Sequence, residues 1–178
     1  MSPEQKELVK QTWLKVAPMA DAAARLFYDR LFEIDATTRP LFKTTDLTEQ
    51  RRKLIQALTM VVQGLDHLEA LVPTIADLGR RHAQFGVTDA HYDTVGAALL
   101  WTLEQGLGSG WTPEVKVAWS GAYALLADVM RAAASESASP PAHSAIANSS
   151  DMVDRSLISN QTCNVAYWPI AADYCAGT

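Results

Sequence analysis

Apolar residues recur every three or four positions along most of the chain, which is the period of an amphipathic helix. In the stretch from Ile75 to Val87, for example, Ile75, Leu78, His82 and Phe85 fall on one helical face. No stretch sustains the period-two alternation of a strand, and no Asn-Gly or Asp-Gly hairpin occurs. The pattern predicts an all-α fold of roughly seven helices with short connectors. Their expected bounds are Ser2 to Pro18, Met19 to Phe32, Asp35 to Phe42, Asp46 to Gln63, Pro73 to Gly86, Thr88 to Leu107 and Thr112 to Ala134.

Helix start and stop signals set these bounds. Ser2 is a favourable N-cap, and the proline that follows it suits the first helical position. Asp46 has capping-box spacing to Glu49. Pro73 is expected to open a helix that Gly86 closes.

The character of the chain changes at Ser135. The stretch SESASPPAHSAIANSS is low in complexity, and no lysine occurs after Lys116. We therefore expect a helical domain over residues 1–134 and a largely disordered C-terminal tail over 135–178. Within that tail, AYWPIAADYC is more apolar and could dock on the body or on a partner.

Composition excludes several classes of function. The chain has 178 residues, of which 48% are hydrophobic, and this is ample for one core. Its net charge of −5 argues against nucleic acid as a partner. It has no apolar run near the roughly 20 residues that cross a bilayer, and no signal-peptide core. Both cysteines, Cys163 and Cys175, lie in the tail, so we expect a cytoplasmic protein without a disulfide framework.

Candidate chemistry lies on three of the apolar faces. His82 stands in the middle of its stripe, and a neutral imidazole can be the single axial ligand of haem iron. The alternative is a core histidine whose ring nitrogens are hydrogen-bonded. Tyr28 lies within a buried face, and Gln50 precedes Leu54 by one turn on another. With Phe42 between them, these faces suggest a slot for a flat apolar ligand.

At these residues the sequence resembles a globin, specifically the bacterial single-domain haemoglobins and the globin domain of flavohaemoglobins. The matching stretches occur in the order and near the spacing of that family. They are LFYDRLF (26–32), RPLF (39–42), EQRRKL (49–54), GRRHAQFGV (79–87), AHYDTVG (90–96) and AWSGAYALLADV (118–129). The resemblance covers about residues 3–134 and implies a globin fold around a haem pocket.

The resemblance implies a role for each matching residue. His82 matches the proximal histidine that binds haem iron, and Tyr92 matches a tyrosine beside it. Tyr28 and Gln50 match the distal pair. Because O2 on ferrous iron gains partial superoxide character, donors at these two positions would stabilise it more than the less polar CO.

The remaining expected haem contacts follow from the same comparison. Phe42 matches the phenylalanine that packs on the haem face, and Leu54 the apolar residue one turn after the distal position. Val87 and Val95 complete the apolar cofactor-binding set. The candidates for the haem propionates are Lys53, Arg80 and Arg81, for which the alternative is a solvated helix face.

Two departures from the family pattern affect the expected chemistry. Flavohaemoglobins have a glutamate late in the last helix that completes a proximal network, and Ala134 takes that position here, with Glu136 two residues beyond it. This predicts a weaker electron push on the iron. The tail also has no Gly-rich dinucleotide fingerprint, so sustained NO dioxygenation would need an external reductase.

The sequence therefore supports four functional hypotheses. The first is a haem b globin, monomeric or homodimeric, that reversibly binds O2, and also CO and NO, for storage or transport. The second is nitric oxide detoxification as an NO dioxygenase with a separate reductase. The third is a haem-based gas sensor whose tail is the output. The fourth is a helical module without haem.

Overall fold

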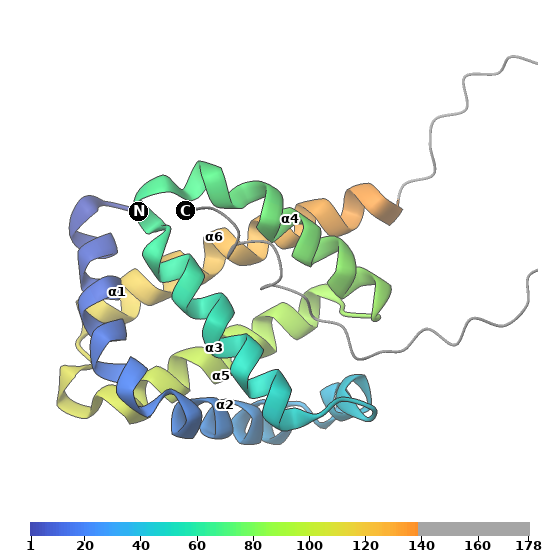
Figure 1. The fold of residues 1–178 in the computed structure, drawn as a ribbon, viewed down its shortest axis with the longest axis horizontal. Helices are drawn as coiled ribbons and strands as arrows, with labels where there is room; N and C mark the ends of the chain where they lie inside the picture. The colour runs from blue at the N-terminus through green and yellow to red at the C-terminus, as the bar shows by residue number, and fades with distance from the viewer. Residues whose placement is uncertain (139–178) are drawn as a thin grey trace, which may run out of the picture.

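The computed structural model describes residues 1–138, and within them it is all-α with no strand, as the periodicity predicts. Six α-helices follow one another with short 3-10 turns between them (Figure 1). The α-helices are α1 (Pro3–Val16), α2 (Ala20–Ile34), α3 (Leu47–Gln63), α4 (Leu68–Gln84), α5 (Asp89–Leu107) and α6 (Pro113–Ala138). The 3-10 helices are η1 (Ala17–Met19), η2 (Ala36–Phe42), η3 (Leu65–His67) and η4 (Gly108–Gly110).

Most of the predicted helix caps are present. Ser2 forms a capping box with Gln5, and the Asp46 carboxylate accepts the amides of Thr48 and Glu49. At the start of α5 the Thr88 amide donates to His91 Nδ1 at 3.1 Å. Capping groups take up amide donors that a helix start would otherwise leave unsatisfied, which explains why the sequence located these ends so closely.

Two helix ends differ from the expectation. α4 begins at Leu68 and carries Pro73 inside it, so Pro73 does not open the helix. The proline gives up only the hydrogen bond to the carbonyl four residues back, and this loss falls little more than one turn from the helix start. α6 continues to Ala138, past Ala134, because no helix breaker stands between Ser135 and the next proline, Pro140. The rest of the expected tail lies outside the described residues.

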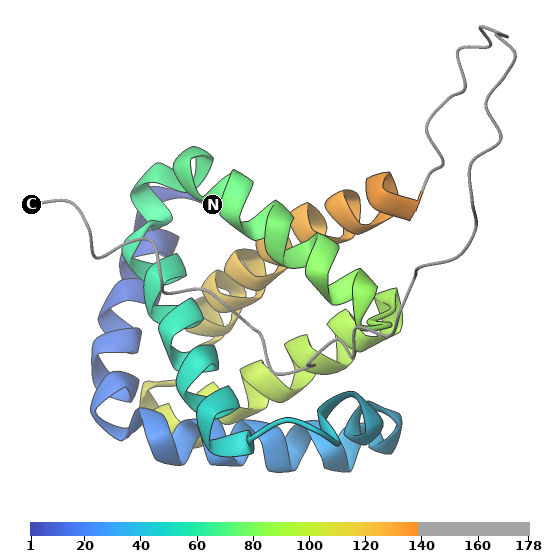
Figure 2. The same cartoon turned by 45° about the vertical axis from the view of Figure 1, so that its right-hand side comes forward.

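The helices pack around a central core, with α1 against α6, α2 against α5 and α4 against α6. In both ribbon views α2 lies along the lower edge, while α4 and α6 cross above it (Figures 1 and 2). Gly79 permits the close approach of α4 to α6, since a Cβ at this position would lie 2.4 Å from the Met130 carbonyl oxygen. Gly86 then ends α4 with a φ of +79°.

A helix must be both long and apolar to cross a bilayer. Within the described residues, none of the helices meets both requirements.

Candidate functional site

A cavity of about 210 Å³ lies between α2, η2, α3, α4, α5 and α6. The surface of its walls is largely apolar, although several polar side chains stand among the lining residues. The structure brings together at this cavity most of the predicted site residues: Tyr28, Phe42, Gln50, Leu54, Arg81, His82, Val87, Tyr92 and Val95. Of the described residues that the sequence singled out, Lys53 and Arg80 are outside the lining.

His82 comes from the last turn of α4 and is fixed by the backbone of its own helix. Its Nδ1 lies 2.7 Å from the Leu78 carbonyl oxygen. Only an N–H can donate to a carbonyl, so this contact assigns the Nδ1-protonated tautomer and makes Nε2 the basic ring nitrogen. Burial lowers the pKa of His82 below its ordinary value, although the contact with Leu78 opposes the shift. The ring is therefore neutral, as a metal-ligating imidazole must be.

Tyr92, on α5, covers the His82 ring. The two ring centroids are 6.2 Å apart with 26° between the planes. The Tyr92 backbone carbonyl accepts a hydrogen bond from the Tyr123 hydroxyl of α6 at 2.5 Å. The Tyr92 hydroxyl itself is buried and has no hydrogen-bond partner within the described part of the chain.

Tyr28 and Gln50 lie on α2 and α3, and both are 5% exposed. The Gln50 side chain lies near enough to the Tyr28 hydroxyl to act on it. Burial raises the pKa of Tyr28 far above its ordinary range, against the smaller opposing effects of Gln50 and Arg51. Tyr28 thus stays protonated and keeps a hydroxyl donor beside the cavity.

Aromatic rings pack against Tyr28. Phe42 meets Tyr28 edge-on at 5.5 Å between centroids, and Phe32 meets Phe42 at 5.6 Å. Edge-to-face contacts are a favoured arrangement of aromatic rings. They hold Tyr28 and Phe42 in fixed orientations where η2 turns back toward α3.

The basic residues near the cavity differ in their positions. Arg81 lines it and pairs with Asp77 at 2.5 Å, whereas Arg80 pairs with the same carboxylate at 3.6 Å from outside the lining. Of the three predicted propionate candidates, Arg81 is therefore the one that the fold brings to the cavity.

Several residues of the site were not singled out by the sequence. His91 accepts a hydrogen bond from the Thr88 amide at the start of α5 and also lines the cavity. Tyr123, Leu126 and Met130 of α6 complete the wall, and their spacing of three and four residues was the available signal. Arg131, which lies over the Tyr92 ring, had no such signal.

Comparison with known proteins identifies the class to which this fold and cavity belong. The family model described as Globin matches residues 25–130, and the chain belongs to the globin family. The chain is 29% identical over 124 residues to the flavohemoprotein of Bacillus subtilis, a match that covers 68% of this chain and 31% of that protein. It is 31% identical over 132 residues to the flavohemoprotein of Bordetella parapertussis, covering 73% and 33% respectively. The chain thus spans about a third of the length of these curated relatives.

Membership of this family implies haem binding, and the residues present fit that cofactor. Haem iron would need a ligand from a protein side chain, which a neutral imidazole can supply. The cavity offers such an imidazole among apolar walls, with an arginine at its lining for a carboxylate. Within residues 1–138, by contrast, no cluster of three histidine, cysteine or acidic side chains could hold a bare metal ion.

Proposed function

We propose that this globin carries haem b and reversibly binds O2, and also CO and NO, at iron ligated by His82. One observation carries the proposal. A single apolar cavity contains a backbone-anchored neutral imidazole and a buried tyrosine–glutamine pair, on separate helices. The haem, when bound, supplies the iron that takes up the diatomic ligand.

His82 holds the cofactor in this proposal. Its Nδ1–H donates to Leu78, which orients the ring and raises the electron density available at Nε2. Because the carbonyl belongs to the same helix, four residues back, the orientation is set before any ligand enters.

Tyr28 and Gln50 provide hydrogen-bond donors for a polar diatomic ligand. One net hydrogen bond is worth about 1–1.5 kcal/mol, which corresponds to roughly a tenfold change in affinity. Since both side chains are buried, neither has to be reoriented from solvent when a ligand arrives.

The apolar lining excludes water, and Arg81 holds the edge of the cofactor. Phe42 and Leu54 cover the side near Tyr28, and Val87 and Val95 extend the apolar wall. A dry cavity strengthens each polar contact within it and slows oxidation of the iron. Arg81 would bind a propionate through its guanidinium.

The test is the visible absorption spectrum of the reduced protein with and without CO. We expect wild type to take up stoichiometric haem, to be five-coordinate when reduced and to bind CO. His82→Gly should lose the iron–imidazole signature, while His67→Gly, whose side chain is 80% exposed outside the cavity lining, should keep it. A wild-type protein that takes up no haem would falsify the proposal.

A second candidate function is NO dioxygenation, which the similarity to two flavohemoproteins favours. The reaction joins NO and O2 into nitrate with one electron, which a reductant must supply. The same donors, Tyr28 and Gln50, would serve it. Continued NO consumption in the presence of a reductant supports this activity, and consumption that stops after a single turnover excludes it.

A further inference from the structure

Three planar side chains from three helices lie in a row on the His82 side of the cavity. His82 of α4 stacks on Tyr92 of α5 at 6.2 Å, and the Arg131 guanidinium of α6 lies over the Tyr92 ring at 5.3 Å from its centroid. A cation at this distance from an aromatic face is attracted by the ring quadrupole. The row therefore links the position of Arg131 to that of His82 through one ring.

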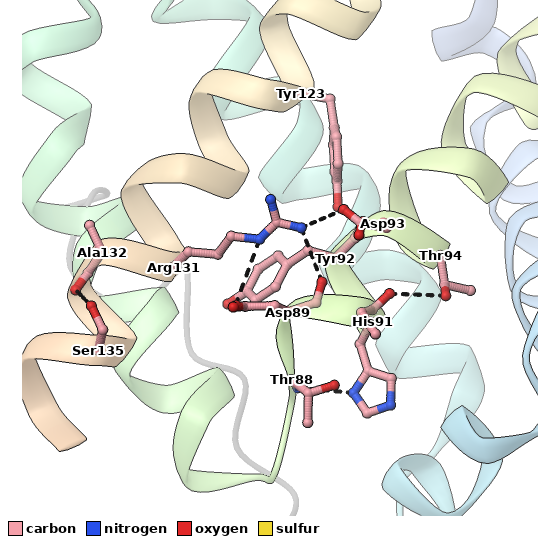
Figure 3. A network of polar contacts seen from close by, with 11 residues as sticks. Thr88, Asp89, His91, Tyr92, Asp93, Thr94, Tyr123, Arg131, Ala132 and Ser135 are labelled. Carbon is pink, nitrogen blue, oxygen red and sulfur yellow. Dashed lines mark hydrogen bonds and ion pairs between the residues drawn. The ribbon is translucent and has the colours of Figure 1, made fainter.

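Arg131 is itself held from two directions, as Figure 3 shows. Its Nη2 donates to the Asp89 backbone carbonyl at 3.0 Å and to Asp93 Oδ1 at 2.5 Å. Its Nε lies 3.8 Å from Asp89 Oδ1. Both hydrogen bonds come from Nη2, and Nε has only the longer ion-pair contact among the described residues. The first turns of α5 thus hold the guanidinium in place.

The Tyr92 ring has no comparable anchor of its own. Its hydroxyl is buried without a partner among residues 1–138, and the bond from Tyr123 reaches its backbone only. Rotation of the ring is therefore restrained by what lies against it, notably the imidazole and the guanidinium. Without the guanidinium, this part of the restraint would be lost.

We propose that Arg131 is a positioning residue, which holds the Tyr92 ring against His82 and so sets the rotation of the imidazole about its bond to Leu78. This inference rests on the proposed function, in which that imidazole binds the iron. Arg131 acts through Tyr92 and does not line the cavity. It accordingly affects the iron–imidazole bond without contacting the cofactor.

The chain offers a matched control for the test. Arg30 lies over the Trp101 ring at 5.1 Å from its centroid and pairs with Glu33 at 2.8 Å, away from the cavity lining. Its side chain is 32% exposed and that of Arg131 is 31% exposed. Arg30→Met and Arg131→Met thus remove the same kind of contact at two sites of similar exposure.

The experiment measures the iron–imidazole stretching band of the reduced, haem-loaded protein by resonance Raman spectroscopy, and the rate of haem loss to an excess of an acceptor protein. Arg131→Met should shift or broaden the band and speed haem loss about two- to fivefold, the factor expected from a cation–π contact of this kind. Arg131→Lys should lie between Arg131→Met and wild type. Asp93→Asn, which keeps the arginine and weakens its anchor, should move the band in the same direction by less.

The outcomes separate this inference from the proposed function. An Arg131→Met protein that loads with haem and shows the wild-type band overturns the positioning role and leaves haem binding by His82 intact. Equal band shifts in Arg131→Met and Arg30→Met also overturn it, since general loosening would then explain both. A wild-type chain without haem uptake overturns both proposals. If Arg131→Met does not fold, the band of Asp93→Asn decides.

Discussion

The two sides of the cavity support their polar groups in different ways. On the side of α2 and α3, Tyr28 and Gln50 are buried near each other, and aromatic rings pack against Tyr28. On the side of α4, His82 is held by its own backbone, and Tyr92 beside it depends on residues of α6. The first arrangement joins consecutive helices. The second depends on the relative positions of α4, α5 and α6. A substitution at the contact between α4 and α6 should therefore disturb the His82 side before the Tyr28 side.

The largest effect is expected from Gly79→Ala, which introduces a Cβ 2.4 Å from the Met130 carbonyl oxygen. A backbone atom cannot rotate aside, so the two helices must separate. We expect a loss of about 1–3 kcal/mol in the free energy of unfolding, although alanine is the better helix former. Urea unfolding followed by circular dichroism measures it.

Gly106→Ala is the matched control. A Cβ there meets Val16 at 3.8 Å, an ordinary contact, so its stability should stay constant or rise by up to about 1 kcal/mol. If both alanine variants change the free energy of unfolding by the same amount, the close approach of α4 to α6 does not determine the stability of the His82 side.

The next effect concerns the other side of the cavity. Tyr28→Phe or Gln50→Leu should speed O2 release roughly tenfold, since each removes a hydrogen-bond donor worth about 1–1.5 kcal/mol. CO release should change much less because CO is the less polar ligand. Stopped-flow release rates of both gases give the comparison, and equal changes for O2 and CO would contradict donation by this pair.

Tyr123→Phe tests the backbone support of Tyr92. The substitution keeps the ring and removes the hydroxyl that donates to the Tyr92 carbonyl. The expected cost is about 0.5–1.5 kcal/mol of unfolding free energy, with O2 release unchanged. Altered O2 release at unchanged stability would mean that the two sides of the cavity are not independent.

The smallest effect is expected on the stability of the fold at alkaline pH. Burial raises the pKa of Tyr28 in the folded state, whereas in the unfolded chain the group ionises near about pH 10. The folded state therefore keeps a proton that the unfolded state loses, and this stabilisation is complete below about pH 10 and declines as the pH rises above it. Wild type should lose stability more steeply there than Tyr28→Phe. Parallel unfolding curves for the two proteins would rule out this contribution.

The sequence alone located those helix ends and helix faces that local signals, such as capping residues and helical spacing, determine. Ser2 and Asp46 cap their helices in the way their side chains predict, and the Thr88 amide donates to His91 at the start of α5. Helical spacing placed His82 and Tyr28 on apolar faces, and both line the cavity. Such signals work within one or two turns, so they can be read without knowing what packs against the helix.

The start of α4 shows where a local signal misleads. Pro73 is a good first residue for a helix, but the observed helix begins at Leu68, where His67 and η3 precede it. Proline removes one hydrogen bond without forbidding a preceding turn, and the packing of α4 against α6 compensates for that loss.

The sequence by itself determined the all-α class, the order of the helices and the apolar stripes that carry His82, Tyr28 and Gln50. Only the tertiary structure decided which cations reach the cavity, since it placed Arg81 in the lining and Lys53 and Arg80 outside it. It also brought Arg131 over Tyr92, a residue far away in the sequence. The physical reason is that helical periodicity fixes the face from which a side chain leaves, whereas the contacts of a long cationic side chain depend on how neighbouring helices cross.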